Sequence, residues 1–124
     1  MKKVLILVSA VLLLTSCEIF DNRGYPFKVN FGSQGGTQKV FGDEGIYTLE
    51  IADYNANGTS AQIDTITDSL IVTYEWLTAK AKMLDFDRSI TLIAEPNKTG
   101  KKRRFYVRGM VDNYSIDIKV TQSP

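Results

Sequence analysis

An all-β fold is predicted by this sequence: a sandwich of about seven or eight short strands, preceded by a cleaved signal segment. Three observations predict it. Apolar and polar residues alternate in short runs, β-branched and aromatic residues fill these runs, and turn-forming residues separate them. Without the first 16 of its 124 residues the chain keeps 108, a size typical of one domain with one compact core.

Alternation marks the strands in the first half of the chain. In residues 27–31, Phe27, Val29 and Phe31 alternate with polar residues, which is typical of a strand with one buried face. Glycine-rich or polar segments end such runs because they form turns. The expected strands are 27–31, 37–41, 47–51, 63–67 and 70–77, with turns at 32–36, 42–45 and 53–60.

The second half continues the same pattern with one interruption. Residues 78–84 (TAKAKML) would tolerate a helix but are short and lack a helix cap, so we expect an irregular or single-turn connection. Residues 95–100 contain Pro, Asn and Gly, which favour a turn. The expected strands are 90–94, 103–110 and 116–120, with a turn at 111–113.

The N-terminus has the layout of an export signal. Lys2 and Lys3 precede an apolar run of eleven residues, 4–14, which is shorter than the roughly 20 residues a membrane-spanning helix needs. A secretory signal without lipid and a membrane anchor are the alternatives. Cys17, the only cysteine, follows Leu-x-Ser directly, and this favours a lipoprotein signal over residues 1–16 with lipid attached to Cys17.

Lipidation would hold the protein at a membrane. More than one acyl chain is needed for stable attachment, and a triacylated Cys17 would meet that need. Residues 18–26 (EIFDNRGYP) mix charges with Asn, Gly and Pro, as a flexible tether does. The predicted organisation is a signal peptide over 1–16, a lipidated tether over 17–26 and a sandwich domain over 27–124. The predicted location is the outer membrane, on its cell-surface or periplasmic face.

Charge and composition exclude several classes of function. Without Lys2 and Lys3, thirteen basic and fourteen acidic residues remain, a net charge of −1, so we expect no nucleic-acid partner. The chain has no histidine, which rules out a Ser-His-Asp or Cys-His arrangement. Asp85 and Asp87 are a carboxylate pair of the kind that hydrolyses glycosides, or two solvated loop residues. We do not expect an enzyme.

Four motifs follow one another in a familiar order. Gly35-Gly36-Thr37 fits a tight hairpin, Trp76-Leu77 lies near the middle, residues 97–103 contain Asn-x-Thr and an Arg, and Val120-Thr121-Gln122 ends the last strand. This order resembles the BACON family of immunoglobulin-like modules of Bacteroidetes surface and periplasmic proteins. The resemblance implies an immunoglobulin-like sandwich, and the family name implies carbohydrate binding. Each motif also has a local structural explanation, since Asn97 suits a turn and Gln122 can satisfy backbone groups.

One segment has the spacing of a calcium loop. Segment 53–64 has Asp53, Asn55 and Asn57 at its first, third and fifth positions, Gly58 at its sixth and Asp64 at its twelfth. This is the spacing of a twelve-residue calcium loop with oxygen ligands. Strands rather than helices are expected on both sides, and the twelfth residue is the shorter Asp. A plain Asn/Gly turn is the competing interpretation. We expect no other cofactor.

A basic cluster is a second candidate site. Lys98, Lys101, Lys102, Arg103 and Arg104 place five cations within seven residues and predict a patch for an anionic partner. If a strand begins there, alternate side chains point to opposite faces, and the lysines then serve to discourage edge pairing.

Aromatic residues are the candidates for sugar binding. Tyr54 and Tyr114 lie in polar turns, and Trp76 is the one tryptophan. These three are the predicted glycan-binding residues, although Trp76 also matches the core tryptophan of a sandwich.

Two functions remain open from the sequence. The first is a non-catalytic, lipid-anchored envelope protein acting as a structural or protein-interaction module in an outer-membrane complex. The second is a carbohydrate-binding module that uses loop aromatics. Aromatic residues gathered on one concave face would favour the glycan, and an open sheet edge would favour a protein partner.

Overall fold

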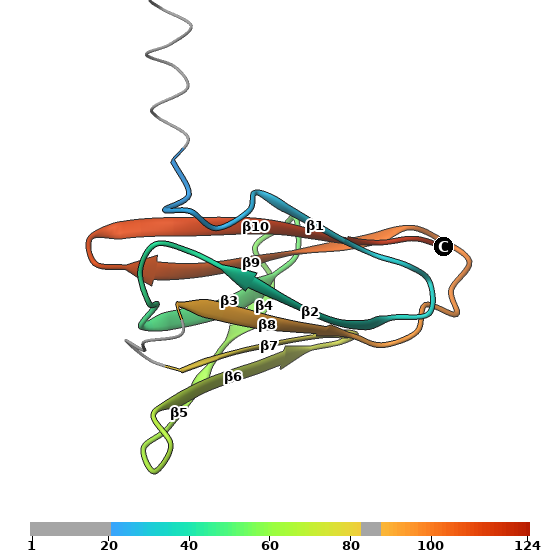
Figure 1. The fold of residues 1–124 in the computed structure, drawn as a ribbon. Helices are drawn as coiled ribbons and strands as arrows, with labels where there is room; N and C mark the ends of the chain where they lie inside the picture. The colour runs from blue at the N-terminus through green and yellow to red at the C-terminus, as the bar shows by residue number, and fades with distance from the viewer. Residues whose placement is uncertain (1–20, 83–87) are drawn as a thin grey trace, which may run out of the picture.

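The computed structural model describes residues 21–82 and 88–124. The predicted signal at 1–16, Cys17 and the Asp85/Asp87 pair lie outside the described residues. Ten strands of the described residues form two five-stranded sheets packed as a sandwich (Figure 1). This confirms the predicted all-β sandwich, with more strands than the seven or eight expected. Among the residues described, no helix is long and apolar enough to cross a membrane.

The first sheet contains both chain ends of the domain. Its order is β1-β10-β9-β3-β4. β1 runs parallel to β10, with Lys28 opposite Lys119, and the other pairs are antiparallel. The bounds are β1 Lys28–Phe31, β3 Thr48–Ala52, β4 Gly58–Ser60, β9 Arg103–Val111 and β10 Tyr114–Gln122.

The second sheet is antiparallel throughout, in the order β2-β8-β7-β6-β5. Only Ala61 separates β4 from β5, and its N–H donates to the Leu49 carbonyl at 2.8 Å, so the chain bends here from one sheet into the other. The bounds are β2 Gly36–Phe41, β5 Gln62–Asp64, β6 Ser69–Tyr74, β7 Leu77–Lys82 and β8 Ser89–Ala94.

The core lies between the two sheets and draws on both. Strands β6 to β10 alternate buried and more exposed residues along most of their length, as the two-residue period of a strand requires. Burying each large aliphatic side chain stabilises the fold by about 1.5–3 kcal/mol relative to exposure. Fully buried side chains include Ile46, Ile51, Leu70, Leu77, Ile90, Leu92, Val107, Ile116, Ile118 and Val120.

The prediction is wrong in two respects for residues 70–82, the part of the segment 70–84 that the structure describes. The expected strand 70–77 ends at Tyr74, because Glu75 takes a positive φ of 52° and Tyr74 pairs with Leu77 across a hairpin. The expected irregular connection is strand β7, in which Leu77, Ala79 and Ala81 are buried. Pairing with β6 and β8 overrides the weak strand preference of its alanines and lysines.

One predicted turn and one predicted strand also differ from the structure. Part of the expected turn 53–60 is strand β4, and β5 covers only the first part of the expected strand 63–67. The turn 32–36 is confirmed, but it crosses between the sheets instead of closing a hairpin. Gly35 has a φ of 78°, and a Cβ there would lie 2.3 Å from the Ala94 carbonyl oxygen, so only glycine fits this crossing.

Candidate interaction surfaces

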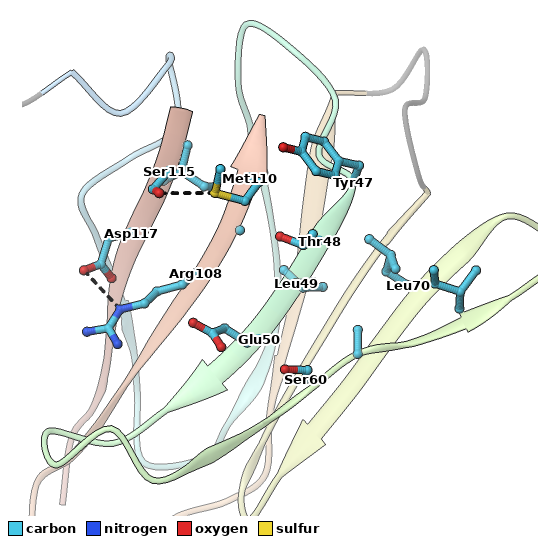
Figure 2. A pocket seen from close by; sticks show the side chains of 14 residues that line it. Tyr47, Thr48, Leu49, Glu50, Ser60, Leu70, Arg108, Met110, Ser115 and Asp117 are labelled. Atoms are coloured by element: carbon cyan, nitrogen blue, oxygen red, sulfur yellow. Dashed lines mark hydrogen bonds and ion pairs between the residues drawn. The ribbon is translucent and has the colours of Figure 1, made fainter. Parts of the chain in front are cut away.

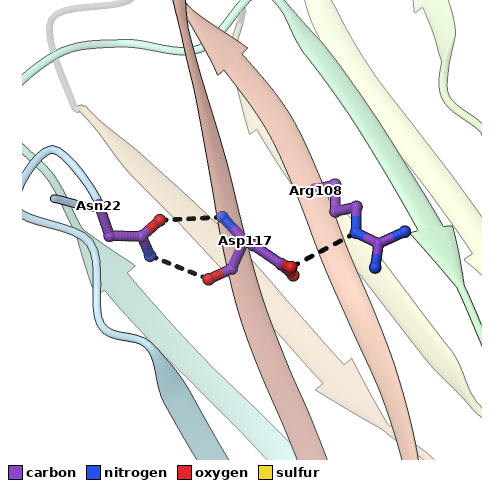
Figure 3. A network of polar contacts seen from close by, with 3 residues as sticks. All are labelled: Asn22, Arg108 and Asp117. Carbon is purple, nitrogen blue, oxygen red and sulfur yellow. Dashed lines mark hydrogen bonds and ion pairs between the residues drawn. The ribbon is translucent and has the colours of Figure 1, made fainter. Parts of the chain in front are cut away.

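The N-terminal segment 22–26, which we call the clasp, is part of the domain. The Asn22 carboxamide lies against the backbone of Asp117 on β10 (Figure 3). Its Oδ1 accepts from the Asp117 N–H at 2.9 Å, and its Nδ2 donates to the carbonyls of Asp117 and Pro26, both at 3.0 Å. Asn22 is 6% exposed, so the predicted tether is wrong for residues 22–26.

Tyr25 holds the other side of the clasp. It is 3% exposed, and its hydroxyl donates to the Glu44 carbonyl at 2.7 Å. Its ring occupies the space beside Gly42, where a Cβ would come within 2.0 Å of the ring. Burial, together with the nearby Asp43 carboxylate, raises the pKa of Tyr25 to about 12.

Alkaline pH should therefore weaken the fold. Because the pKa of Tyr25 is about 12 in the fold and 10.0 ordinarily, its stabilising contribution is complete below about pH 10 and is lost as pH rises through about 12. Urea unfolding across this range should show a smaller loss of stability in Tyr25→Phe than in the wild type. Tyr54→Phe, at an exposed position, should behave as wild type, and equal losses in all three would contradict the assignment.

A shallow groove of about 430 Å³ lies over β10, β9 and β3 and ends at the bend between β4 and β5 (Figure 2). Arg108 lies between Glu50 on β3 and Asp117 on β10, and its Nε is 3.5 Å from the Asp117 carboxylate. The groove thus offers one cation, two carboxylates and several hydroxyls beside apolar residues. The lining includes Thr48, Ser60, Ile63, Leu70, Met110 and Ser115.

The groove combines few charged groups with apolar side chains. Its charged groups are half-buried or exposed. Within residues 21–82 and 88–124, His, Cys, Asp and Glu do not gather in groups of three or more that suit a metal ion.

The structure separates the predicted glycan-binding tyrosines. Tyr54 follows the end of β3 and is 77% exposed, whereas Tyr114 starts β10 and is 52% exposed. These positions are at opposite ends of the first sheet, because Ala52 pairs with Tyr106 while Tyr114 pairs with Val111. The Arg23 guanidinium also covers the Tyr114 ring, 3.4 Å from its centroid.

Trp76 belongs to the core. It is 6% exposed and stacks on Phe105, with ring centroids 5.0 Å apart and an interplanar angle of 12°. The Arg103 guanidinium lies 4.8 Å from the Trp76 ring centroid. The indole therefore has no open face for a sugar, and its predicted glycan-binding role is wrong.

Arg103 and Gln122 join Trp76 in a network that we call the end knot. Gln122 is fully buried; its Oε1 accepts from Arg103 Nε at 2.8 Å, and its Nε2 donates to the Gly32 and Glu95 carbonyls at 3.1 and 2.7 Å. The Glu95 N–H in turn donates to the Trp76 carbonyl at 2.9 Å. The end knot thus links the crossing after β1 with β7, β8, β9 and β10.

Asn97 extends the end knot into the loop between β8 and β9. Its N–H donates to the Ser33 carbonyl at 2.6 Å, and its Nδ2 donates to the Lys101 and Ser123 carbonyls at 2.7 and 2.9 Å. The turn-forming role predicted for Asn97 is confirmed.

The side chains of the predicted basic cluster do not all face the solvent. Lys98, Lys101, Lys102 and Arg104 are exposed. Arg103 turns inward, where it bonds to Gln122 and donates to the Pro96 carbonyl at 3.2 Å. The cluster therefore does not form one patch of five cations.

The twelve-residue calcium loop does not form. Asp53 caps its own turn, because its Oδ1 accepts from the N–H groups of Asn55 and Asn57 at 2.8 and 2.9 Å. Asp64 ends β5 in the other sheet and accepts from the Ile66 N–H at 3.0 Å. Strands β4 and β5 occupy the segment between the two aspartates, so the competing interpretation as a turn is the correct one for Asp53–Asn57.

The hairpin of β5 and β6 exposes apolar side chains that the sequence did not reveal, at its turn and on both of its faces, because Ile63 pairs with Leu70 and Ile71 follows Leu70 on β6. It projects from the sandwich on the side opposite the described N-terminal residues (Figure 1). Ile63, Ile66 and Ile71 are 53%, 92% and 45% exposed. We call these three side chains the isoleucine hairpin. The content of β-branched and aromatic residues predicted strands over 63–67 and 70–77 without indicating which side chains are exposed, and the only available signal was three isoleucines within nine residues.

The fold defines a two-sheet β-sandwich. No protein-family model matches the chain, and no curated protein matches it. Among solved structures it is similar to a protein from Bacteroides thetaiotaomicron determined by NMR, at 14% identity and a TM-score of 0.50, covering 83% of this chain and 85% of that one. This likeness shows a shared fold.

A second solved structure is a Bacteroides ovatus GH5 xyloglucanase in complex with a XXXG heptasaccharide, at 17% identity and a TM-score of 0.48. The match covers 78% of this chain and 17% of that chain.

Proposed function

We propose that this protein is a lipid-anchored, non-catalytic interaction module of the bacterial cell envelope, and that its partner is a protein. The isoleucine hairpin is the observation that carries the proposal. Ile66 is 92% exposed at the turn, and Ile63 and Ile71 are about half exposed on either face of the same hairpin, so a partner that surrounds the hairpin would bury all three side chains. β5 is also an edge strand of only three residues, so a partner can reach both its side chains and its open backbone edge.

The anchor and the class of module are the sequence-based parts of the proposal. Cys17 directly after a short apolar run supports lipid attachment at the outer membrane. The order of the motif residues supports an immunoglobulin-like module of the BACON type, and the end knot gives a physical reason for that order, because it joins Trp76, Arg103 and Gln122.

The glycan alternative has less support from the geometry. A sugar-binding platform needs open aromatic faces close together, whereas Trp76 is buried and Tyr54 and Tyr114 lie at opposite ends of one sheet. A protein partner on the isoleucine hairpin requires none of these three residues.

Charge placed on the hairpin tests the proposal. The mature chain, residues 17–124 with Cys17→Ser, would be tagged and used to capture proteins from envelope extract. Ile66→Asp should reduce capture of a specific protein at least about tenfold, since it replaces an apolar contact of roughly 1.5–3 kcal/mol by a charge. Thr65→Asp adds the same charge at the exposed neighbouring position and should reduce capture far less.

Two outcomes would contradict the proposal. The first is equal capture by wild type, Ile66→Asp and Thr65→Asp. The second is binding on a glycan array that Ile66→Asp leaves intact while no protein is captured.

A further inference from the structure

Cations gather on the outer face of the first sheet. Alternation along β9 places Lys102, just before the strand, on the same face as Arg104 and Arg108. Lys119 on β10 and Lys28 on β1 are register partners and add two more cations. We call these five residues the basic face. The near-neutral charge of the whole chain therefore hides an uneven distribution between its surfaces.

Two carboxylates share this face, because Glu50 and Asp117 flank Arg108 and Asp117 also lies two residues before Lys119 on β10, so the cations outnumber the carboxylates. Lys28 and Lys119 lie directly opposite each other, an arrangement that costs stability because like charges repel across a strand pair. Among the residues that the structure describes, the two ion pairs join Arg23 to Asp21 and Arg108 to Asp117. The other four cations of the basic face form no ion pair with described residues, so their charge is available to an anionic partner.

Aromatic rings lie among these cations. The Arg104 guanidinium is 5.9 Å from the Tyr54 ring centroid, and that of Arg108 is 5.3 Å from the Tyr106 centroid. Phe27, next to Lys28, is 54% exposed. Exposed aromatic residues beside cations are typical of surfaces that contact lipid headgroups.

The clasp places this face near the predicted anchor. Asn22 is bonded to Asp117, two residues before Lys119 on β10. Four residues separate Cys17 from Asn22, and a chain of this length reaches at most about 17 Å when fully extended. A lipid on Cys17 therefore keeps Asn22 within about 17 Å of the bilayer. This upper limit is about twice the screening length of about 8 Å at physiological salt, so the segment is short enough to let the basic face reach the headgroups when it is not fully extended.

We propose that the basic face binds the phosphate groups of an anionic lipid membrane, the same membrane in which Cys17 is anchored. The proximity argument rests on the proposed lipid anchor, whereas the charge and aromatic arguments do not. In this orientation the isoleucine hairpin, on the side of the sandwich opposite the N-terminal residues, remains open to a protein partner (Figure 1).

Vesicle co-sedimentation tests this inference without the anchor. The mature chain 17–124 with Cys17→Ser is mixed with vesicles of phosphatidylcholine alone or of phosphatidylcholine with phosphatidylglycerol. We expect binding to the anionic vesicles, weakened by added salt, and none to the neutral ones. Lys28→Gln combined with Lys119→Gln should weaken binding at least about tenfold.

The matched control removes two lysines elsewhere. Lys80 and Lys82 are exposed on β7 of the second sheet, so Lys80→Gln with Lys82→Gln changes the net charge equally and should weaken binding less than about twofold. Circular dichroism confirms that each variant is folded. Since Lys28 and Lys119 lie in the first sheet and the isoleucine hairpin lies in the second, the vesicle result for the Lys28/Lys119 variant is independent of the protein-capture experiment.

The inference would be overturned if the protein did not bind anionic vesicles or if both double variants weakened binding equally. It would also be overturned if the protein bound an acidic polysaccharide but no vesicles, and Lys28→Gln/Lys119→Gln lost that binding. The last result would assign the basic face to a glycan. Displacement from vesicles by inorganic phosphate, but not by chloride of equal ionic strength, would also overturn it, since it would indicate a site for the free ion.

Discussion

Trp76→Ala should lower the free energy of unfolding by about 3–5 kcal/mol. The indole is buried, stacks on Phe105 and lies against the Arg103 guanidinium, so its removal leaves a cavity and exposes the buried polar groups of the end knot. Urea unfolding of the mature chain measures the loss. Tyr54→Ala, which removes an exposed aromatic ring, should change stability by less than about 0.5 kcal/mol.

A loss below about 1 kcal/mol for Trp76→Ala would contradict its placement in the core. Such a result would also mean that the Trp76 indole is accessible to a ligand.

Asn22→Ala should lower the free energy of unfolding by about 2–3 kcal/mol. The carboxamide bonds to both the N–H and the carbonyl of Asp117, and removing a buried partner leaves those groups unsatisfied at a cost of about 1–3 kcal/mol each. Asn113→Ala, at an exposed position in the turn before β10, is the control. If both alanine variants are equally stable, residues 22–26 behave as the tether that composition predicts.

Local patterns predicted the strands whose two faces differ most. Alternation along β1 and β8 was sufficient because their buried positions carry Val, Phe, Ile and Leu. Strand β7 was missed because its buried positions after Leu77 are alanines, which are equally at home in a helix or a loop. The neighbouring strands β6 and β8 decide its conformation, and they are not visible in a local window.

The motif residues were interpreted correctly one at a time but not as a set. Asn97 and Gln122 were assigned to a turn and a strand end, and both assignments hold. Asn97 and Gln122 form the end knot together with Trp76 and Arg103. This network depends on contacts between residues as much as 90 positions apart, such as Gln122 and Gly32. No spacing rule within one sequence relates such distant positions.

The candidate surfaces were the least predictable part. Asn22 precedes Arg-Gly-Tyr-Pro, a composition typical of linkers, and only the backbone of Asp117 gives it a structural role. Lys28 and Lys119 become neighbours through the parallel register of β1 and β10. The exposure of Ile66 depends on where the second sheet ends, which alternation does not define.

The positions of these surfaces suggest how the proposed module is oriented relative to the membrane. The clasp holds the chain entry against β10, the basic face lies beside it, and the isoleucine hairpin projects from the opposite side (Figure 1). In the proposed arrangement one side meets the membrane and the other meets a protein.

Photo-cross-linking in intact cells tests the central claim most directly. A photoreactive amino acid would replace Ile66 in the full chain, with the exposed Lys98 in the loop between β8 and β9 as the control position. The proposed function predicts a covalent adduct between position 66 and one envelope protein, and no such adduct from position 98. Adducts only with lipid or polysaccharide at position 66, or the same protein adducts from both positions, would contradict it.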